Sequence, residues 1–224
     1  MQSRTLVHRA ALGLAVAMLS LAIVPAAMAA KLVNRNLTQL IADSETIIAG
    51  TVTAVTDGIN ENGVPYTEVT IAVASAAKGV VKGAAKRAPR ATADEAPAYT
   101  FRQFGLLEPR VMDNGRTFLG VTPEGFARWH EGETVIAFLH KPASMTGLQT
   151  TAGLAHGKLV LRNGRYANEF DNRGLFDGVE INRGLTTPAQ QNMLLNPGPA
   201  DAGALMELIE RAVADSWIER GEMR

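Results

Sequence analysis

The residues whose types and spacing most suggest chemistry are four consecutive positions, His130, Glu131, Gly132 and Glu133. They resemble the start of a zinc-protease helix, in which a second histidine four residues after the first places both imidazoles on one helical face. Thr134 occupies that position instead. Gly132 and the β-rich run after it also disfavour a helix. The pattern therefore predicts a polar turn that leads into a strand.

His130, His140 and His156 are the candidate metal ligands, because strands can bring distant residues together. With Glu131 or Asp171 as hydrogen-bond partners, their imidazoles would suit a metal-dependent hydrolase. No close-spaced pair of ligands supports this arrangement. We therefore predict no resident metal and no other cofactor, and we keep a hydrolase that uses these three histidines as an alternative.

Patterns typical of other reaction centres are missing from the sequence. No serine lies in the G-x-S-x-G turn of serine hydrolases, and there is no cysteine to act as a nucleophile. Carboxylate pairs such as Asp171 and Asp177 occur on any polar surface, so they do not indicate a glycosidase. We assign no catalytic residue, and the sequence favours a protein without enzymatic activity.

Arg128, Trp129 and His130 are the candidate binding residues. Tryptophan and arginine are the side chains that most often anchor interfaces. The alternative interpretation places Phe126 and Trp129 in the core beside the strand that follows, because tryptophan is mostly buried in small domains.

A second candidate surface is the segment 84–98, which is rich in alanine, proline and charge and has no apolar periodicity. Such a composition indicates a surface loop. A docking patch for an acidic partner could be formed by the basic residues in and before it, Lys78, Lys82, Lys86, Arg87 and Arg90. Asp94 and Glu95 follow without interleaved aromatic residues, so a solvated loop is the favoured interpretation.

The first 29 residues predict export. Arg4 and Arg9 precede an apolar run over 10–24, and Ala27-Met28-Ala29 is a small-residue cleavage signal. The run is shorter than the roughly 20 residues that span a membrane. We expect a signal peptide over 1–29 and a mature chain over 30–224 without a membrane span, located in the periplasm or outside the cell. The alternative is a retained N-terminal anchor.

Composition limits the partners. The 224 residues carry 22 basic and 22 acidic side chains, so there is no electrostatic reason to expect nucleic acid. The lack of cysteine excludes disulfides and a lipid-modified cysteine. A hydrophobic content of 46% suits one well-buried domain. The partners that we expect for an exported binding module are a protein or an envelope polysaccharide.

Apolar periodicity predicts a mainly β domain with flanking helices. Gly50 lies in an apolar strand face, where a missing side chain permits a bend or the close approach of another backbone. Asn163-Gly164 predicts a type I′ hairpin. The expected elements are a short helix capped by Asn36, strands over 46–56, 66–74, 99–104, 134–139, 153–162 and 165–170, and an amphipathic helix over about 200–220 that is capped by Asp201 and sealed by Trp217.

Three pieces of the sequence form a recognisable set. They are Ala42-Asp43 followed by Ile47, Ile48, Gly50 and Val52; Tyr66-Thr67 through Val73 to Lys78-Gly79; and Phe126 with Gly132-Glu133 before the apolar run 135–139. Together they resemble a loosely defined family of exported bacterial proteins of unknown function, over most of the mature chain to about Arg162. These motifs are structural, so the resemblance implies no catalytic residue.

The first two pieces also resemble the N-terminal domain of tissue inhibitors of metalloproteinases and the related netrin-like modules. This resemblance implies an oligonucleotide/oligosaccharide-binding-like, partly open antiparallel barrel of five to six strands. Those inhibitors chelate the protease zinc through an N-terminal cysteine, which this chain lacks. Our leading hypothesis is a non-catalytic binding module of the cell envelope, and a protease-inhibitor-like module is the last-ranked alternative.

Overall fold

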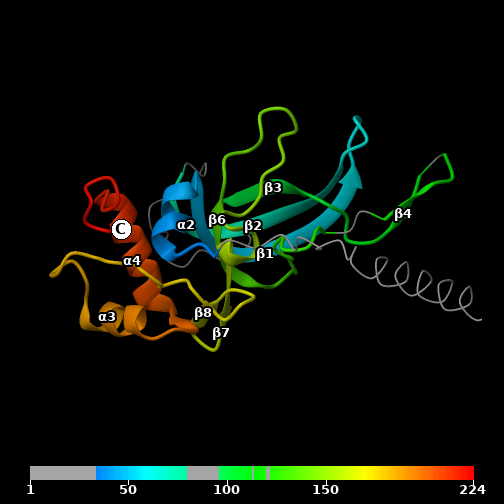
Figure 1. Ribbon diagram of the computed structural model, residues 1–224. Coiled ribbons are helices and arrows are strands. Elements are labelled where there is room, and N and C mark those ends of the chain that lie inside the picture. The colour runs from blue at the N-terminus through cyan, green and yellow to red at the C-terminus, as the bar shows by residue number, and fades with distance from the viewer. Residues whose placement is uncertain (1–33, 80–95, 113, 120–121) are drawn as a thin grey trace, which may run out of the picture. The chain divides into compact units, whose positions relative to one another are not determined.

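The computed structural model describes residues 34–79, 96–112, 114–119 and 122–224. The predicted signal peptide and most of the segment 84–98 lie outside the described residues. Figure 1 shows a mainly β arrangement with flanking helices, as the sequence predicts. None of the helices in the described part of the chain is long and apolar enough to cross a membrane.

Seven strands of the described residues form one antiparallel sheet in the order β3-β2-β1-β6-β7-β8-β9. Their bounds are β1 Thr46–Ile59, β2 Pro65–Lys78, β3 Ala98–Phe104, β6 Thr134–Leu139, β7 Lys158–Arg162, β8 Arg165–Ala167 and β9 Ala200–Asp201. A separate two-stranded hairpin is made of β4 (Arg110–Val111) and β5 (Thr117–Phe118).

The predicted barrel of five to six strands is not confirmed, because the described strands form a sheet that does not close. The end strands of the sheet, β3 and β9, are not paired with each other. Closure depends on the tilt and stagger of neighbouring strands, and the alternation of apolar residues along one strand carries no information about either. The sequence pattern therefore predicts the strands and their faces but not how the sheet ends.

At Gly50 the backbone of β2 lies close to β1. A Cβ atom built on Gly50 would lie 2.1 Å from the carbonyl oxygen of Ala72, so no larger residue fits without a backbone shift. The pairing register also changes between Ala49 and Gly50, as at a β-bulge. The predicted close approach of another backbone at Gly50 is confirmed.

The strand β6 is buried on both faces, as predicted, and pairs with β1 and β7. Ile136 and Phe138 face a core cluster that includes residues of α2 (Leu37–Asp43) and α4 (Ala202–Ala214). Val135, Ala137 and Leu139 face a second cluster on the other side of the sheet. The sheet therefore separates two cores.

The helices at the two ends of the described chain begin where the sequence predicts. Asn36 caps α2, and its side chain forms a reciprocal capping box with Gln39. Asp201 caps α4 by accepting a hydrogen bond from the backbone N–H of Ala204. Trp217 lies beyond the end of α4 and is 1% exposed. It packs in the same cluster as α4, which confirms its predicted sealing role.

A third helix, α3 (Pro188–Leu195), is missing from the sequence-based prediction. Its start carries ordinary signals, because Thr187 and Gln190 form a capping box and Pro188 occupies the first turn. It has no clear apolar stripe, since its buried residues are Gln190 and Met193. A helix without a stripe is not detected by a search for apolar periodicity.

The hairpin of β7 and β8 is shorter than predicted, but its turn is confirmed. Asn163 and Gly164 have φ angles of 51° and 76°, which is the left-handed conformation that a type I′ turn requires at both positions. The residues before β7 form a 3-10 turn, η1 (Leu154–Gly157), in place of strand. This turn and the hairpin bring the charged residues of β7 beside the segment that precedes β6.

Candidate functional site

The segment before β6 alternates between buried and exposed residues. Ala127 and Trp129 are buried, whereas Arg128 and His130 are exposed. The chain then turns at Gly132, which has a φ of 84° and donates its N–H to the Val52 carbonyl oxygen at 2.8 Å. The predicted polar turn into the strand is confirmed, and it leaves Arg128 and His130 at the surface.

Trp129 is a core residue that is 5% exposed. Its ring meets Phe101 edge-on, with 5.3 Å between the ring centroids. The indole Nε1 donates to Gln103 Oε1 at 3.1 Å, and Gln103 Nε2 donates to the Ala127 carbonyl oxygen at 3.0 Å. Because these bonds hold the backbone on both sides of Arg128, Trp129 positions its exposed neighbours.

Lys158, at the start of β7, is a buried cation that is 6% exposed. Its Nζ donates to the Glu133 carboxylate and to the Arg128 carbonyl oxygen. The same amine lies 4.9 Å from the centre of the Trp129 ring. Burial lowers the pKa of the Lys158 amine, and the nearby Glu133 carboxylate opposes that effect. The ion pair thus ties β7 to the segment before β6.

Glu133 connects the buried amine to the exposed imidazole. Its Oε2 accepts the backbone N–H of His130 at 3.1 Å, and its Oε1 lies 3.2 Å from His130 Nδ1. Burial alone would raise the pKa of Glu133, but the hydrogen bonds and charge of Lys158, helped by His130, lower it overall. Glu133 is therefore held as a carboxylate, and it fixes the turn and the orientation of the His130 ring.

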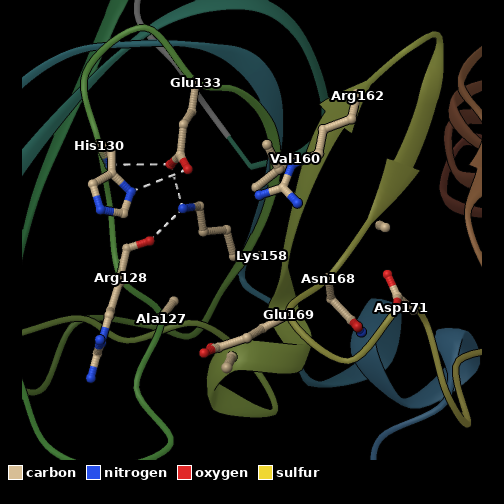
Figure 2. A pocket seen from close by; sticks show the side chains of 12 residues that line it. Ala127, Arg128, His130, Glu133, Lys158, Val160, Arg162, Asn168, Glu169 and Asp171 are labelled. Carbon is tan, nitrogen blue, oxygen red and sulfur yellow. Dashed lines mark hydrogen bonds and ion pairs between the residues drawn. The ribbon is translucent and has the colours of Figure 1, made fainter.

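A pocket of about 250 Å³ opens beside this ion pair, between the 127–133 segment and the β7–β8 hairpin (Figure 2). Strand alternation places Lys158, Val160 and Arg162 on one face of β7, and Ala167 pairs with Val160 across the hairpin. The polar residues that line the pocket are Arg128, His130, Glu133, Lys158, Arg162, Asn168, Glu169 and Asp171.

A second hollow lies on the other side of the same segment. Its lining includes Thr67, Gln103, Leu107 and Thr122 together with Arg128, Trp129 and His130. The candidate binding residues Arg128 and His130 therefore line both hollows.

The three histidines considered as metal ligands have different surroundings. His130 contacts Glu133, whereas His140 Nδ1 lies 3.0 Å from the Asp43 carbonyl oxygen. The ring of His156 is buried and stacks on Phe170, with 4.5 Å between the ring centroids. Within the described ranges, no group of three or more histidine, aspartate or glutamate side chains is arranged to hold a metal ion.

Of the two carboxylates considered as hydrogen-bond partners of the histidines, Asp171 lines the same pocket as His130. Glu131 has a structural contact, since its Oε1 accepts the Val55 backbone N–H at 3.1 Å. Lys78, from the predicted basic patch, donates to the Ile41 carbonyl oxygen at 3.0 Å. The other four residues of that patch lie outside the described part of the chain.

Sequence reasoning missed Lys158, Arg162, Asn168 and Glu169 as site residues. One signal was present: Lys158 and Arg162 alternate with Leu159 and Leu161, so they share a strand face. Nothing in the alternation indicates that this face lies against the 127–133 segment. That contact links residues about 30 positions apart and exists only in the folded chain.

The fold and the site define a mainly β protein with an open seven-stranded sheet in its described part and a charged pocket beside a buried ion pair. Comparison of the chain with protein-family models, with curated proteins and with solved structures returned no match. We therefore infer its function from the chemistry of the site.

Proposed function

We propose that this protein is an exported, non-catalytic binding module of the cell envelope, and that Arg128 and His130 contact its ligand. One observation carries the proposal: both side chains are exposed between two hollows, on a backbone that buried residues hold in place. The guanidinium of Arg128 forms no ion pair with any described residue. A guanidinium held in this way suits an anionic or acceptor-rich group of a ligand.

Binding is favoured over catalysis because the reactive groups beside the pocket already have structural partners. The Lys158 amine is bonded to Glu133 and to the backbone of residue 128. The Glu133 carboxylate is shared between Lys158 and His130. The residues that line this pocket include no serine, threonine or cysteine that could serve as a nucleophile.

Export is the part of the proposal that rests on the sequence pattern over 1–29. We expect the mature protein to begin near Ala30 and to be recovered outside the cytoplasm. Intact-mass measurement on protein from fractionated cells tests this directly. A full-length mass in the cytoplasmic fraction would contradict export.

Affinity capture tests the binding function. Wild-type protein should enrich a specific protein, polysaccharide or small molecule from envelope extract. The double variant Arg128→Ala/His130→Ala should retain at least about tenfold less of it, because hydrogen bonds from charged groups are stronger than neutral ones. The matched control is Arg183→Ala, which removes an exposed arginine that lines neither hollow.

Two kinds of result would contradict the proposal. Equal capture by the wild-type protein and the double variant, or no specific capture at all, would remove Arg128 and His130 as ligand contacts. Stoichiometric metal in the purified protein would favour the metal-dependent hydrolase. Stoichiometric inhibition in a titration against metalloproteases would favour the inhibitor-like module.

A further inference from the structure

We infer, on the basis of the proposed binding function, that the pocket beside Lys158 binds a small zwitterion, a molecule with both a carboxylate and an ammonium group such as an amino acid or a dipeptide. The pocket lining includes basic and acidic side chains that form no ion pairs with other described residues. Its volume of about 250 Å³ suits a small ligand.

Arg128 and Arg162 supply the positive charges that line the pocket beside the buried Lys158 amine. Both line it, and neither forms an ion pair within the described part of the chain. A guanidinium presents its N–H groups as a planar fork that matches the two oxygens of a carboxylate. A ligand carboxylate should therefore contact one of these guanidinium groups, and Arg162 is the one drawn beside the Lys158 side chain in Figure 2.

Glu169 and Asp171 supply the negative charges that line the pocket. Both are exposed residues that line the same pocket, and neither pairs with a described cation. Ionised carboxylates only accept hydrogen bonds, so they suit the three donors of an ammonium group. We expect the ligand ammonium to lie beside one of these carboxylates.

The opposite charges lie around one buried amine without pairing with each other. Figure 2 shows the side chains of Arg162 and Glu169 on either side of Lys158. The charge of Glu169 raises the pKa of the Lys158 amine, and the charge of Arg162 lowers it, although burial is the largest influence. Because the Lys158 amine is itself held by Glu133, Arg162 and Glu169 both stay available to a ligand that carries both charges.

Asn168 adds an independent sign of a missing partner. It lines the pocket and is 6% exposed, and its Nδ2 has no hydrogen-bond partner among the described residues. Its Oδ1 accepts the backbone N–H groups of Phe170 and Asn172, both at 2.9 Å, which fixes the orientation of the amide. A buried donor without a partner is unfavourable, so this amide marks an unsatisfied position in the pocket wall.

A neutral sugar is a poorer fit to this lining. Among the described residues, no phenylalanine, tyrosine or tryptophan lines the pocket, and the nearby Trp129 ring lies under the Lys158 amine. The apolar lining consists of short aliphatic side chains, Ala127, Ala155, Val160 and Ala167. These side chains leave room for a small aliphatic group between the two charged ends.

Isothermal titration with a free dipeptide and its three capped forms tests the inference. The probes are L-alanyl-L-alanine, its N-acetyl form, its amide, and the form blocked at both ends. We expect the zwitterion to bind at least about tenfold more tightly than either singly blocked form, because each block removes one charge-assisted contact. The doubly blocked form should not bind measurably.

Two variants assign the ends. Arg162→Met should weaken the zwitterion and the N-acetyl form but not the amide, and Glu169→Gln should weaken the zwitterion and the amide but not the N-acetyl form. Both positions are exposed, so the variants should melt like the wild-type protein. Arg183→Ala is again the control and should leave all four titrations unchanged.

Several outcomes would overturn the inference. Equal binding of the zwitterion and the N-acetyl form would show a plain anion site, and equal binding of all four forms would show that neither charge is recognised. If no probe binds while the capture that depends on Arg128 and His130 persists, the ligand class is wrong and the binding function stands. If capture is also absent, both are wrong.

Discussion

The two faces of the sheet pack against chemically different groups. On the face covered by α2 and α4, the buried cluster is almost wholly apolar and includes Leu208 and Trp217. On the other face, Trp129 packs beside polar partners, namely the Gln103 amide and the Lys158 amine. The first face is a conventional hydrophobic core, and the second combines a core with a hydrogen-bonded network that reaches the surface.

This difference separates stability from geometry. The hydrophobic effect is non-directional, so burial of apolar side chains stabilises a fold without fixing their orientations. Many side-chain arrangements of similar volume give a similar stability. Hydrogen bonds and ion pairs require particular distances and angles. Removing one partner destabilises the fold, because the other partner is left buried and unsatisfied. The polar face therefore holds Arg128 and His130 in fixed positions, at the cost of burying the charge of Lys158.

The largest expected effect is on the helix-covered face. Trp217→Ala should lower the free energy of unfolding by about 3–5 kcal/mol, because it removes a large side chain from a packed cluster. Urea denaturation followed by circular dichroism measures this loss. Affinity for the captured ligand should stay unchanged at temperatures where the variant is folded. A loss below about 1 kcal/mol would mean that the helix does not depend on this seal.

Breaking the ion pair should have the next largest effect. Glu133→Leu leaves the buried Lys158 amine without its counter-charge and should cost about 3 kcal/mol of unfolding free energy. The double variant Glu133→Leu/Lys158→Met removes both charges and should recover most of that loss. Urea denaturation of both variants measures their free energies of unfolding. Equal values would show that the unpaired Lys158 amine does not destabilise the single variant.

Trp129→Phe should have a smaller effect that is seen in both stability and binding. The variant keeps an aromatic ring near Phe101 but loses the indole donor to Gln103, which should cost about 1–2 kcal/mol. Because Gln103 also holds the Ala127 carbonyl, ligand capture should weaken together with stability. The Trp217→Ala variant is the contrast, since it should lose stability without losing capture. Unchanged capture by Trp129→Phe would remove Trp129 as a positioning residue.

The smallest effect at neutral pH concerns His156. Burial lowers its pKa from the ordinary 6.5, so below about pH 6.5 the unfolded chain takes up a proton that the folded chain resists. The free energy of unfolding should therefore fall as the pH decreases from about 6.5 to about 5. His156→Leu should show a shallower fall in denaturation series over that range. An identical slope in both proteins would contradict the assignment.

The sequence predicts secondary structure best where a few neighbouring residues specify a helix cap or a turn. Helix caps are formed by Asn36 and Asp201, whose side chains accept hydrogen bonds from nearby backbone N–H groups. A tight turn is formed by Asn163-Gly164, because both residues adopt positive φ angles. The apolar run of β6 is buried on both faces as its composition indicates. Prediction fails for α3, whose buried residues Gln190 and Met193 form no apolar stripe.

The candidate site could be predicted only in part. Arg128 and His130 are exposed at the surface, whereas Trp129 between them is buried. Of the three predicted binding residues, two are therefore surface residues and one is a core residue. Arg162 and Glu169 are visible in the sequence as ordinary charged residues of a hairpin. Their place in a pocket depends on the contact between that hairpin and a segment about 30 residues earlier.

The sequence by itself determined the mainly β class, the positions of most strands, the starts of both predicted helices and the absence of disulfides. These properties follow from the periodicity of a strand or helix, from caps and turns, and from composition, which are all local. The predicted end of the second helix, near residue 220, is wrong, because α4 ends at Ala214. Only the tertiary structure decided that the sheet stays open, that Lys158 pairs with Glu133, and that charges of both signs meet in one pocket. Those outcomes depend on strand order and long-range packing, which no short stretch of residues specifies.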